Sequence, residues 1–436
     1  MKYTYKRGAY WLFVYLFLAL IPLIVAISGS TPGNRGFWTE LGVAFGFIGF
    51  GMLCLQFLFS GRFRKIAPTY GMDNLLQFHR EIGILAFLFI LAHPLLLLIV
   101  DFEFISFIDP KVNALRAISL IFVTIAIILV LASSIWRTAF GLDYEKWRLL
   151  HGFLSLAVIF IGTVHSLQVS YYLDPMWKKS AIVLLFLFYG YLVIHTRLTR
   201  PWLNHKKPYK VTGVARERGD SWTIKVKPEK HRRVQFICGQ FVWLTIGKTP
   251  FSLQQHPFTI ASSTSDKELS FTSKESGDFT STWKDIKPGT MVYLEGPFGS
   301  FVPERGKNLF LVMGGIGITP AMAMLRSMKD NKDPRQAVLI YANSEWEDVT
   351  FREELMELSR KINLKLIHLL EKPPENWEGE SGLVSRELLQ KYLPENPEHF
   401  MYFICGPKPL MDISELALRD LGIDWRLIYT ERFEII

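Results

Sequence analysis

Cysteine is scarce in this sequence, and charged residues are few for a chain of its length. Cys54, Cys238 and Cys405 are the only cysteines among 436 residues, and no Cys-x-x-Cys pair occurs. This excludes a disulfide scaffold and argues against a structural zinc site or an iron–sulfur cluster. Charged residues make up 20% of the chain and hydrophobic residues 50%, with a mean hydropathy of +0.20. Such a composition excludes a disordered chain, and we expect part of the protein to lie in lipid.

Six uncharged apolar runs occupy the first part of the chain. A helix of about 20 apolar residues spans the hydrocarbon core of a bilayer, where the backbone must satisfy its own hydrogen bonds. Each run has close to this length, so we predict six membrane-spanning helices. The runs cover residues 8–28, 41–61, 82–100, 117–136, 149–173 and 180–196.

Lysine and arginine are unevenly distributed between the two sides of the predicted helices. The N-terminus, the connections before the third and fifth runs and the segment after the sixth run are rich in them, and the other connections are poorer. The positive-inside rule then places both termini in the cytoplasm. This topology explains the net charge of +9. We therefore predict a multi-pass cell-membrane protein in contact with lipid, and no nucleic-acid binding.

From about residue 209 the sequence has the pattern of a soluble protein. Residues 223–227 and 240–246 alternate polar and apolar side chains, as in a small antiparallel barrel. After about residue 306, short apolar strands alternate with helical stretches, which indicates a parallel sheet. We therefore predict a multi-domain protein: a six-helix transmembrane bundle over residues 1–205, an antiparallel β-barrel over 206–305 and an α/β parallel-sheet domain over 306–436.

Four histidines in the predicted helices share one spacing. His79 and His93 lie fourteen residues apart on the third run, and His151 and His165 lie fourteen apart on the fifth. This is close to four helical turns, so each pair shares a helix face at two levels about 21 Å apart. Both helices cross in the same direction, which brings His79 level with His151 near the cytoplasm and His93 level with His165 nearer the outside. A planar macrocycle at each level would be gripped by one imidazole from each helix.

The histidines have three interpretations. They are helix-packing residues, ligands of a metal ion alone, or axial ligands of two haems. A metal ion alone is less attractive because two imidazoles leave most coordination positions unfilled. Bis-histidine b-type haem fits better, and the sequence has no Cys-x-x-Cys-His motif for covalent attachment. Arg80 and Arg148, close to the inner ligands, either pair with haem propionates or are ordinary positive-inside loop residues.

The second half carries a first nucleotide signal in residues 256–263, His-Pro-Phe-Thr-Ile-Ala-Ser-Ser. A hydroxyl beside an aromatic ring suits the isoalloxazine of a flavin. Residues 277–281, Gly-Asp-Phe-Thr-Ser, follow just before a predicted helix start. Exposed amides at such a start bind a pyrophosphate, and glycine permits close approach. The alternative is an ordinary turn in which Thr280 caps the helix.

A second nucleotide signal is the segment Gly-Gly-Ile-Gly-Ile-Thr-Pro at 314–320, which lies between the predicted strand 309–313 and a helix. A strand, a glycine loop and a helix in this order cradle a dinucleotide diphosphate. Cys-Gly-Pro at 405–407 follows another predicted strand, 401–404, at the edge where such sheets bind ligands. Cys405 is either a buried small hydrophobic residue or a neighbour of the nicotinamide.

These motifs together resemble a known family. HREIG followed by His on the third run, and YEKWRLLHG followed by His on the fifth, look like the ferric-reductase-like transmembrane domain. HPFT, GDFT, EGPFGSF, GGIGITP and CGP occur in the order of the ferredoxin–NADP reductase-type flavin dehydrogenases. Nearly the whole chain thus resembles the NADPH oxidase and ferric reductase superfamily, and in size it is closest to the compact prokaryotic NADPH-oxidase-like members.

The resemblance implies a set of ligand-binding residues. It assigns His79 with His151 to an inner b-type haem and His93 with His165 to an outer one. The residues expected to hold FAD are His256, Pro257, Phe258, Thr259, Ser262, Lys274, Gly277, Phe279 and Thr280. The residues expected to hold NADPH or NADH are Gly314, Gly315, Gly317, Thr319, Gly406 and Pro407. The residues expected beside the reacting rings are Thr259, Cys405 and Phe433, the last resembling the terminal aromatic that shields the flavin.

The resemblance also implies a flavohaem oxidoreductase of the NAD(P)H oxidase or ferric reductase kind. Electrons from cytoplasmic NAD(P)H pass through FAD and the two haems to a small-molecule acceptor outside, with no obligatory protein partner. Oxygen, giving superoxide, is the first expectation. Ferric or cupric chelates are the alternative, as is a membrane-anchored flavin reductase that feeds another redox partner. Leu97 stands where oxidase-type members often have a second histidine, and Glu345 where NADPH-preferring relatives tend to have arginine. Use of NADH is therefore also expected.

Overall fold

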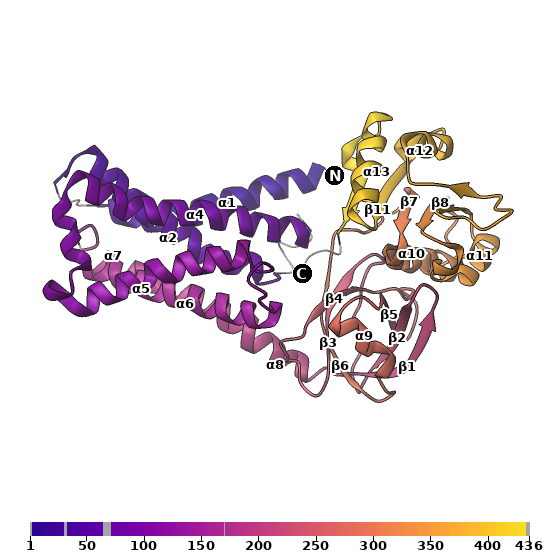
Figure 1. Cartoon of the computed structure of the whole chain (residues 1–436), viewed down its shortest axis with the longest axis horizontal. Coiled ribbons are helices and arrows are strands. Elements are labelled where there is room, and N and C mark those ends of the chain that lie inside the picture. The colour runs from indigo at the N-terminus through magenta and orange to yellow at the C-terminus, as the bar shows by residue number, and fades with distance from the viewer. Residues whose placement is uncertain (1, 30–32, 64–70, 170, 433–436) are drawn as a thin grey trace. The chain divides into compact units, whose positions relative to one another are not determined.

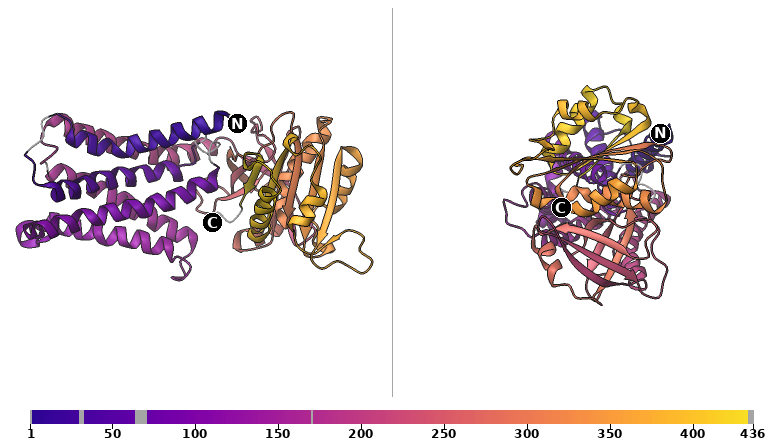
Figure 2. Two further views of the ribbon diagram at one scale, coloured as in Figure 1. Left: turned by 90° about the horizontal axis from the view of Figure 1, so that it is seen from above. Right: turned by 90° about the vertical axis from the view of Figure 1, so that its right-hand side faces the viewer.

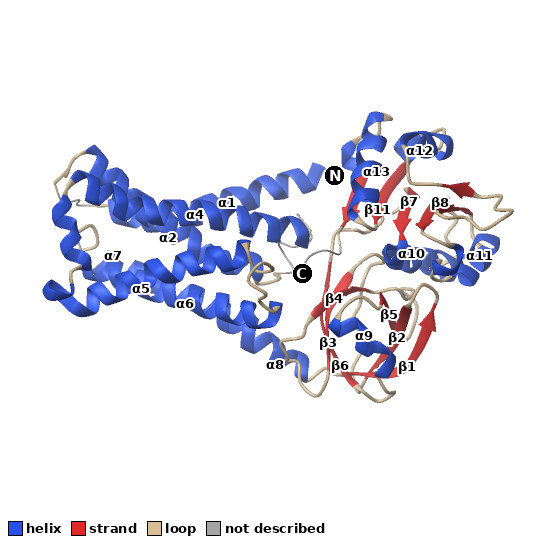
Figure 3. Cartoon of the chain, viewed as in Figure 1, coloured by secondary structure: helices blue, strands red, loops and turns tan. Residues whose placement is uncertain are grey.

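The computed structural model describes residues 2–29, 33–63, 71–169 and 171–432. The chain divides into two compact units, one helical and ending at Arg200, the other mixed and beginning at Pro201. Figures 1 and 3 show that the described strands all belong to the second unit.

Six long apolar helices form the first unit. All six are long and apolar enough to cross a membrane, among the residues that the structure describes. This confirms the predicted bundle and a multi-pass membrane protein. Figure 2 shows the helices lying alongside one another. They are α1 (Lys2–Ile27), α2 (Phe37–Ser60), α4 (Met72–Val100), α5 (Pro110–Ile135), α6 (Tyr144–Val169) and α7 (Met176–Ile194).

Local chemistry sets the ends and the packing of these helices. The Asp109 carboxylate accepts a hydrogen bond from the backbone N–H of Lys111, and Pro110 occupies the first turn, so α5 begins there. α1 and α2 approach closely at Gly51, where an added Cβ would lie 2.1 Å from the Ala19 carbonyl oxygen. Only glycine permits this contact. After α7 the chain continues through a π-helical turn (His195–Thr199) into the short α8 (Arg200–His205).

The second unit begins with a curled antiparallel sheet. Its six strands are arranged in the order β4-β3-β6-β1-β2-β5. Just beyond β4, the backbone N–H of Ala261 donates to the Ser270 carbonyl on β5, which links the two edges of the sheet. The interior is apolar and contains the fully buried Trp283. The strands are β1 (Tyr209–Glu217), β2 (Ser221–Pro228), β3 (Phe241–Ile246), β4 (His256–Thr259), β5 (Leu269–Lys274) and β6 (Met291–Phe298).

A parallel six-stranded sheet follows, in the order β10-β9-β8-β7-β11-β12. Its strands are β7 (Asn308–Gly314), β8 (Ala337–Asn343), β9 (Leu364–Leu370), β10 (Glu380–Ser381), β11 (Phe400–Cys405) and β12 (Ile428–Glu431). The helices between them are α10 (Thr319–Asp330), α11 (Arg352–Lys361), α12 (Arg386–Tyr392) and α13 (Lys408–Asp420). The predicted fold class, a helical bundle followed by an antiparallel and then a parallel sheet, is therefore confirmed.

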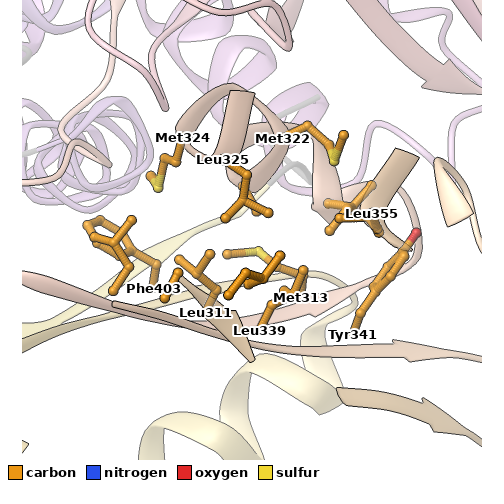
Figure 4. Packing of buried hydrophobic residues seen from close by; sticks show 14 of the residues in the cluster. Leu311, Met313, Met322, Met324, Leu325, Leu339, Tyr341, Leu355 and Phe403 are labelled. Carbon is orange, nitrogen blue, oxygen red and sulfur yellow. The ribbon is translucent and has the colours of Figure 1, made fainter. Parts of the chain in front are cut away.

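Apolar side chains cover both faces of the parallel sheet. Figure 4 shows one face, where Leu325 of α10 points toward Leu311, Met313 and Leu339 of the strands. The opposite face packs against α12 and α13. The interiors of the central strands β7, β8 and β11 are consequently buried on both sides, as expected when helices cover a parallel sheet. The carboxyl ends of β7 and β11 are held at fixed positions by this packing.

Candidate functional site

The four predicted haem ligands come together as two pairs within the bundle. α4 carries His79 and His93, and α6 carries His151 and His165. The ring centroids of His79 and His151 are 6.3 Å apart, and those of His93 and His165 are 6.5 Å apart. Each pair combines one imidazole from each helix, which is the pairing that the spacing predicts.

These separations suit a metal ion held from opposite sides. A ligating nitrogen lies about 2.0 Å from the metal and about 1.1 Å from the centre of its ring, so two opposed imidazoles have centroids about 6.2 Å apart. Two imidazoles at corners of a tetrahedron would have centroids only about 5 Å apart. The separations of 6.3 and 6.5 Å fit the opposed arrangement. A metal ion held in this way would have further coordination positions between the two rings, which another ligand would have to fill.

Further protein ligands for these positions are not found among the residues that the structure describes. Among the described residues, no group of three or more His, Cys, Asp or Glu side chains is placed to hold a metal ion. A haem macrocycle would supply four nitrogen ligands of its own, so two imidazoles from the chain would suffice to hold its iron. One turn beyond His79 on α4, a Cβ added at Gly83 would meet no atom within 4 Å. The residues of both pairs therefore fit bis-histidine b-type haem.

His93 is positioned by glycines of α2, which no sequence pattern singles out. Its Nδ1 lies 2.9 Å from the Gly42 carbonyl oxygen, so the ring N–H donates there and Nε2 stays available to a ligand. An added Cβ at Gly46 would lie 2.9 Å from the same Nδ1, so glycine is needed for the ring to lie against α2. Neither arginine predicted near the inner pair is shown to face it. Arg80 is exposed, and the Arg148 guanidinium lies 5.5 Å from the centre of the Tyr144 ring.

The predicted flavin residues are brought together where β4 meets α9 (Asp278–Ser281). β4 consists of His256, Pro257, Phe258 and Thr259, and the His256 and Phe279 rings are 4.2 Å apart. The Phe258 ring is 6.0 Å from that of Phe279 and stacked on it. A continuous aromatic surface therefore links the two motifs, as a flavin site requires.

Two buried hydroxyls in this region have no hydrogen-bond partner in the part of the chain that the structure describes. Thr259 and Ser262 are both buried, and neither side-chain oxygen has a hydrogen-bond partner among the described residues. Buried polar groups are almost always paired, so these hydroxyls point to a ligand with polar edges. Lys274 is exposed at the end of β5, within a few residues of α9.

The residue that precedes α9 is Gly277 and not Thr280, which the alternative interpretation takes as the helix cap. Gly277 is the residue before the helix, and its φ of +132° lies in the region that favours glycine. Thr280 lies inside the helix, where its hydroxyl accepts a hydrogen bond from the Ser276 N–H. The interpretation of Thr280 as the helix cap is therefore wrong. A Cβ at Gly277 would meet no atom within 4 Å, so its amide is accessible to a phosphate.

The two predicted nucleotide motifs meet at neighbouring strand ends. Gly314 ends β7, Cys405 ends β11, and these strands pair in register along their length. An added Cβ at Gly314 would lie 2.9 Å from Pro407 Cδ, and one at Gly317 would lie 2.5 Å from the Cys405 carbonyl oxygen. The glycines therefore allow the two loops to contact. From β7 the chain continues to β8 on one side, and β11 pairs with β7 on the other side. The carboxyl ends of β7 and β11 therefore lie where the strand order reverses, and sheets of this kind bind dinucleotides there.

The glycine loop itself is held by two hydrogen bonds. The Tyr341 hydroxyl donates to the Gly315 carbonyl at 3.0 Å, and the Thr319 hydroxyl donates to the Ile316 carbonyl at 3.3 Å. Gly315 has a φ of +51°, and a Cβ there would meet no atom within 4 Å. The 3-10 turn formed by this loop (Gly315–Ile318) lies next to β5 of the antiparallel sheet. The nucleotide loop and the predicted flavin region are thus neighbours within this unit.

The predicted residues beside the reacting rings differ in what the structure shows. Cys405 is fully buried in the core of the parallel sheet, together with Met313 and Phe403. Its role beside the nicotinamide stays a prediction. Gly406 follows it, close to Gly314. Phe433 lies outside the described residues, and its shielding role also stays a prediction.

Arg326 on α10 joins the two sheets, a contact that no sequence pattern predicts. Its guanidinium donates to the Ala261 carbonyl at 2.7 Å, just after the predicted flavin strand. It also makes two hydrogen bonds to the Glu354 carboxylate on α11. The side chain is only 15% exposed. A charge-assisted, paired contact of this kind fixes geometry, so Arg326 holds the helix after the glycine loop against the flavin strand.

The loop after β8 carries the nucleotide-preference residue predicted from sequence. Glu345 is about half exposed, and Lys372 Nζ lies 3.9 Å from its carboxylate. Nearby, Asn343 has a buried amide nitrogen without a partner among the described residues. On β9, both ring nitrogens of His368 likewise lack partners there, and burial lowers the pKa of His368 to about 4. Polar groups of β8 and β9 without partners among the described residues thus lie on two neighbouring strands.

Comparison with known proteins identifies three domains in sequence order. The family described as ferric reductase like transmembrane component matches residues 45–162. The FAD-binding domain family matches residues 209–301, and the oxidoreductase NAD-binding domain family matches residues 311–415. Together these matches span both units of the structure.

Curated relatives and solved structures are similar to parts of the chain. NADH-cytochrome b5 reductase 1 of Debaryomyces hansenii is 32% identical over 153 residues, covering 34% of this chain and 54% of the relative. Its namesake from Bos taurus is 30% identical over 178 residues, covering 36% and 58%. The chain spans about half the length of the curated relatives it matches. The flavohaem-like FAD/NAD-binding domain of nitric oxide dioxygenase from Vibrio cholerae has a TM-score of 0.47 and 18% identity, covering 52% of this chain and 98% of that chain.

The fold, the sites and the family matches define a membrane oxidoreductase with an FAD-binding and an NAD-binding domain. The order of the three domains is particular. It is the architecture of the NADPH oxidase and ferric reductase superfamily, and this chain has it, as the sequence motifs predict.

Proposed function

We propose that this protein carries electrons from cytoplasmic NADH or NADPH across the membrane to an acceptor on the outer side. One observation carries the proposal. Two helices of a ferric-reductase-like membrane component present two facing histidine pairs, and the same chain holds FAD-binding and NAD-binding domains. The fourteen residues between the levels correspond to about 21 Å along the helices, so two haems would form relay points at two depths.

The cofactors supply chemistry that no side chain has. When bound, FAD takes a hydride from the nicotinamide as an electron pair, and b-type haem iron carries one electron at a time. The chain supplies the rest. His79 with His151 and His93 with His165 would hold the two haem irons, and the hydroxyls of Thr259 and Ser262 would bind polar atoms of the flavin. Gly314 to Thr319 form the loop for the nucleotide diphosphate. No acid–base residue is required in the membrane.

Oxygen, reduced to superoxide, is the acceptor that the superfamily architecture favours. A ferric or cupric chelate is the second candidate, and Leu97 is the observation that favours it. Leu97 lies one turn beyond His93 on α4, and its side chain faces Gly42 of α2. A leucine offers no hydrogen bond to a small oxygen species next to the outer pair. Cytochrome c reduction that superoxide dismutase abolishes identifies oxygen; chelate reduction that persists without oxygen identifies the metal.

We propose that the protein uses NADH as well as NADPH. The Glu345 carboxylate at the end of the β8 loop would repel a 2′-phosphate, and Lys372 only partly offsets it at 3.9 Å. The dehydrogenase domains and both termini are cytoplasmic in this proposal, because the basic connections lie on that side. Neither nucleic acid nor an obligatory protein partner takes part.

The test measures two half-reactions separately in purified protein reconstituted in lipid vesicles with the dehydrogenase side outward. His93→Leu and His165→Leu should abolish reduction of an acceptor enclosed in the vesicles, while anaerobic reduction of the flavin by NADH continues at the normal rate. His195→Leu is the matched control, because this histidine stacks on Tyr191 and belongs to neither pair.

Two outcomes would contradict the proposal. If enclosed acceptor is reduced equally well by both variants, the outer pair is not on the electron route. If the protein contains no haem, the membrane part is an anchor for a flavin reductase and its histidines are structural.

A further inference from the structure

A tryptophan packs against the inner histidine pair, at the end of the bundle where α5 connects to α6. Trp147 precedes His151 by four residues on α6, so it lies about 6 Å from it along the helix, toward this connection. The two rings are tilted against each other, with their centroids 5.1 Å apart. The indole of Trp147 therefore lies directly against one of the imidazoles proposed to hold the inner haem.

The indole N–H of Trp147 is buried and has no hydrogen-bond acceptor among the residues that the structure describes. Buried donors in this state are rare in native proteins, and a buried indole N–H usually finds a partner. An indole can donate but not accept, so the missing partner has an atom with a free lone pair. Trp147 thus points to an acceptor that belongs to a ligand.

Arg137 brings a positive charge to the same place. It follows the end of α5, three residues after Ser134, whose Oγ lies 3.2 Å from His151 Nδ1. The central carbon of its guanidinium lies 6.0 Å from the centre of the Trp147 ring and 5.5 Å from the centre of the Tyr144 ring. The Arg137 side chain is half-buried and forms no ion pair with a described residue.

The chemistry of these two groups selects an anion. Asp143, an acidic residue of the same connection, forms an ion pair with Lys146 and not with Arg137. A neutral N–H and a cation that both lack an acidic partner among the described residues suit a carboxylate, which accepts several hydrogen bonds. Haem carries two carboxylates on one edge of its macrocycle. Carboxylates are costly in hydrocarbon, so those of an inner haem would lie toward the nearer membrane surface, where Trp147 and Arg137 are.

We propose that Trp147 and Arg137 form the carboxylate-binding site of the inner haem. This inference rests on the proposed function, since it requires haem at the inner pair. Two opposed imidazoles leave a macrocycle free to turn about the axis that joins them. A carboxylate held by Trp147 and Arg137 would stop this rotation and fix which edge of the haem faces the membrane surface. Both are thus positioning residues, and Trp147 also holds the His151 ring in place.

The experiment compares haem with haem dimethyl ester, in which both carboxylates are esterified. Full-length protein with His93→Leu is used, so that only the inner level is loaded, and transfer of the cofactor to excess apomyoglobin is followed in the Soret band. With haem, Trp147→Phe should speed the transfer about 10- to 100-fold, as expected when a hydrogen bond to a charged group is lost. Arg137→Gln should speed it less, because the guanidinium is only half-buried, and Arg137→Lys should restore part of the loss.

With the dimethyl ester, transfer should already be fast when Trp147 and Arg137 are intact, and neither substitution should add much. Equal effects of Trp147→Phe on haem and on its ester would show that the indole acts through ring packing alone, and this would overturn the inference. Unchanged haem transfer in both Trp147→Phe and Arg137→Gln would also overturn it.

Trp136→Phe and Lys146→Gln are the matched controls, because both side chains are exposed in the same region of the chain. Neither should change the transfer of haem. If His93→Leu retains no haem, the same substitutions are made in the otherwise unmodified protein, where one of two transfer phases should respond. A response in neither phase, or in both equally, would contradict the inference. Absence of haem from the unmodified protein would instead overturn the proposed function.

Discussion

Replacing Gly317 with alanine is expected to weaken nucleotide binding strongly without removing the flavin. The added Cβ would lie 2.5 Å from the Cys405 carbonyl oxygen and 2.9 Å from the Gly406 nitrogen. Both are backbone atoms, so no side-chain rotation relieves the clash and one loop must move. Overpacking of this kind costs about 1–3 kcal/mol. If the loop moves away from its nucleotide-binding conformation, the Kd for NADH rises about 5- to 150-fold.

Stopped-flow reduction of the flavin by increasing NADH, without oxygen, measures that Kd. Gly213→Ala on β1 is the control, because a Cβ there would meet no atom within 4 Å. Flavin content should be normal in both variants, since β4 and α9 form the flavin region. An unchanged Kd in Gly317→Ala would refute the assignment of this loop to the nucleotide.

Three further changes test other parts of the chain. Arg326→Gln removes the bond to the Ala261 carbonyl, so the maximal rate of flavin reduction should fall more than the NADH affinity; an equal effect on both would contradict the positioning role. The folded pKa of about 4 for His368 lies below its ordinary value of 6.5, so the unfolded chain gains a proton first and stability should fall as pH drops through this range. The temperature at which flavin is released should therefore fall as the pH is lowered, and it should fall less in His368→Phe than in the unmodified protein. An equal fall in both proteins would exclude His368 as the cause. Lys178→Met leaves two buried carbonyls without their cation at a cost of about 1–3 kcal/mol each, so haem should be lost at lower temperature than in Lys179→Met. Equal haem-loss temperatures would show that the contacts are unimportant.

The sequence was sufficient where periodicity alone fixes position. The spacing of His79 from His93 and of His151 from His165 places each pair on one helix face, and the length of the apolar runs predicts the spanning helices. Residues that act across helices were not predictable in this way. Ser134 meets His151, and Arg137 meets Trp147, only through the packing of α5 against α6. A polar residue in or just after an apolar run is their one sequence signal, and it names no partner.

The soluble half shows the same division. Alternating strands and helices predict a parallel sheet, and the motifs predict its ligand edge. The strand order, however, depends on long-range pairing, and it is this order that brings Cys405 beside Gly314. The contact between Arg326 and the Ala261 carbonyl likewise joins segments far apart in sequence. The start of α9 was also not predictable from local propensity. The helix begins at Asp278, so Thr280 lies inside it, and the Thr280 hydroxyl accepts a hydrogen bond from the Ser276 N–H.

Haem stoichiometry with ligand-by-ligand deletion tests the central claim most directly. A reduced-minus-oxidised spectrum of the pure protein, calibrated against its polypeptide content, should show two six-coordinate b-type haems per chain. His79→Leu or His151→Leu should remove the inner signal, and His93→Leu or His165→Leu the outer one. Finding one haem or none in the unmodified protein, or two in every variant, would contradict the assignment of the paired imidazoles.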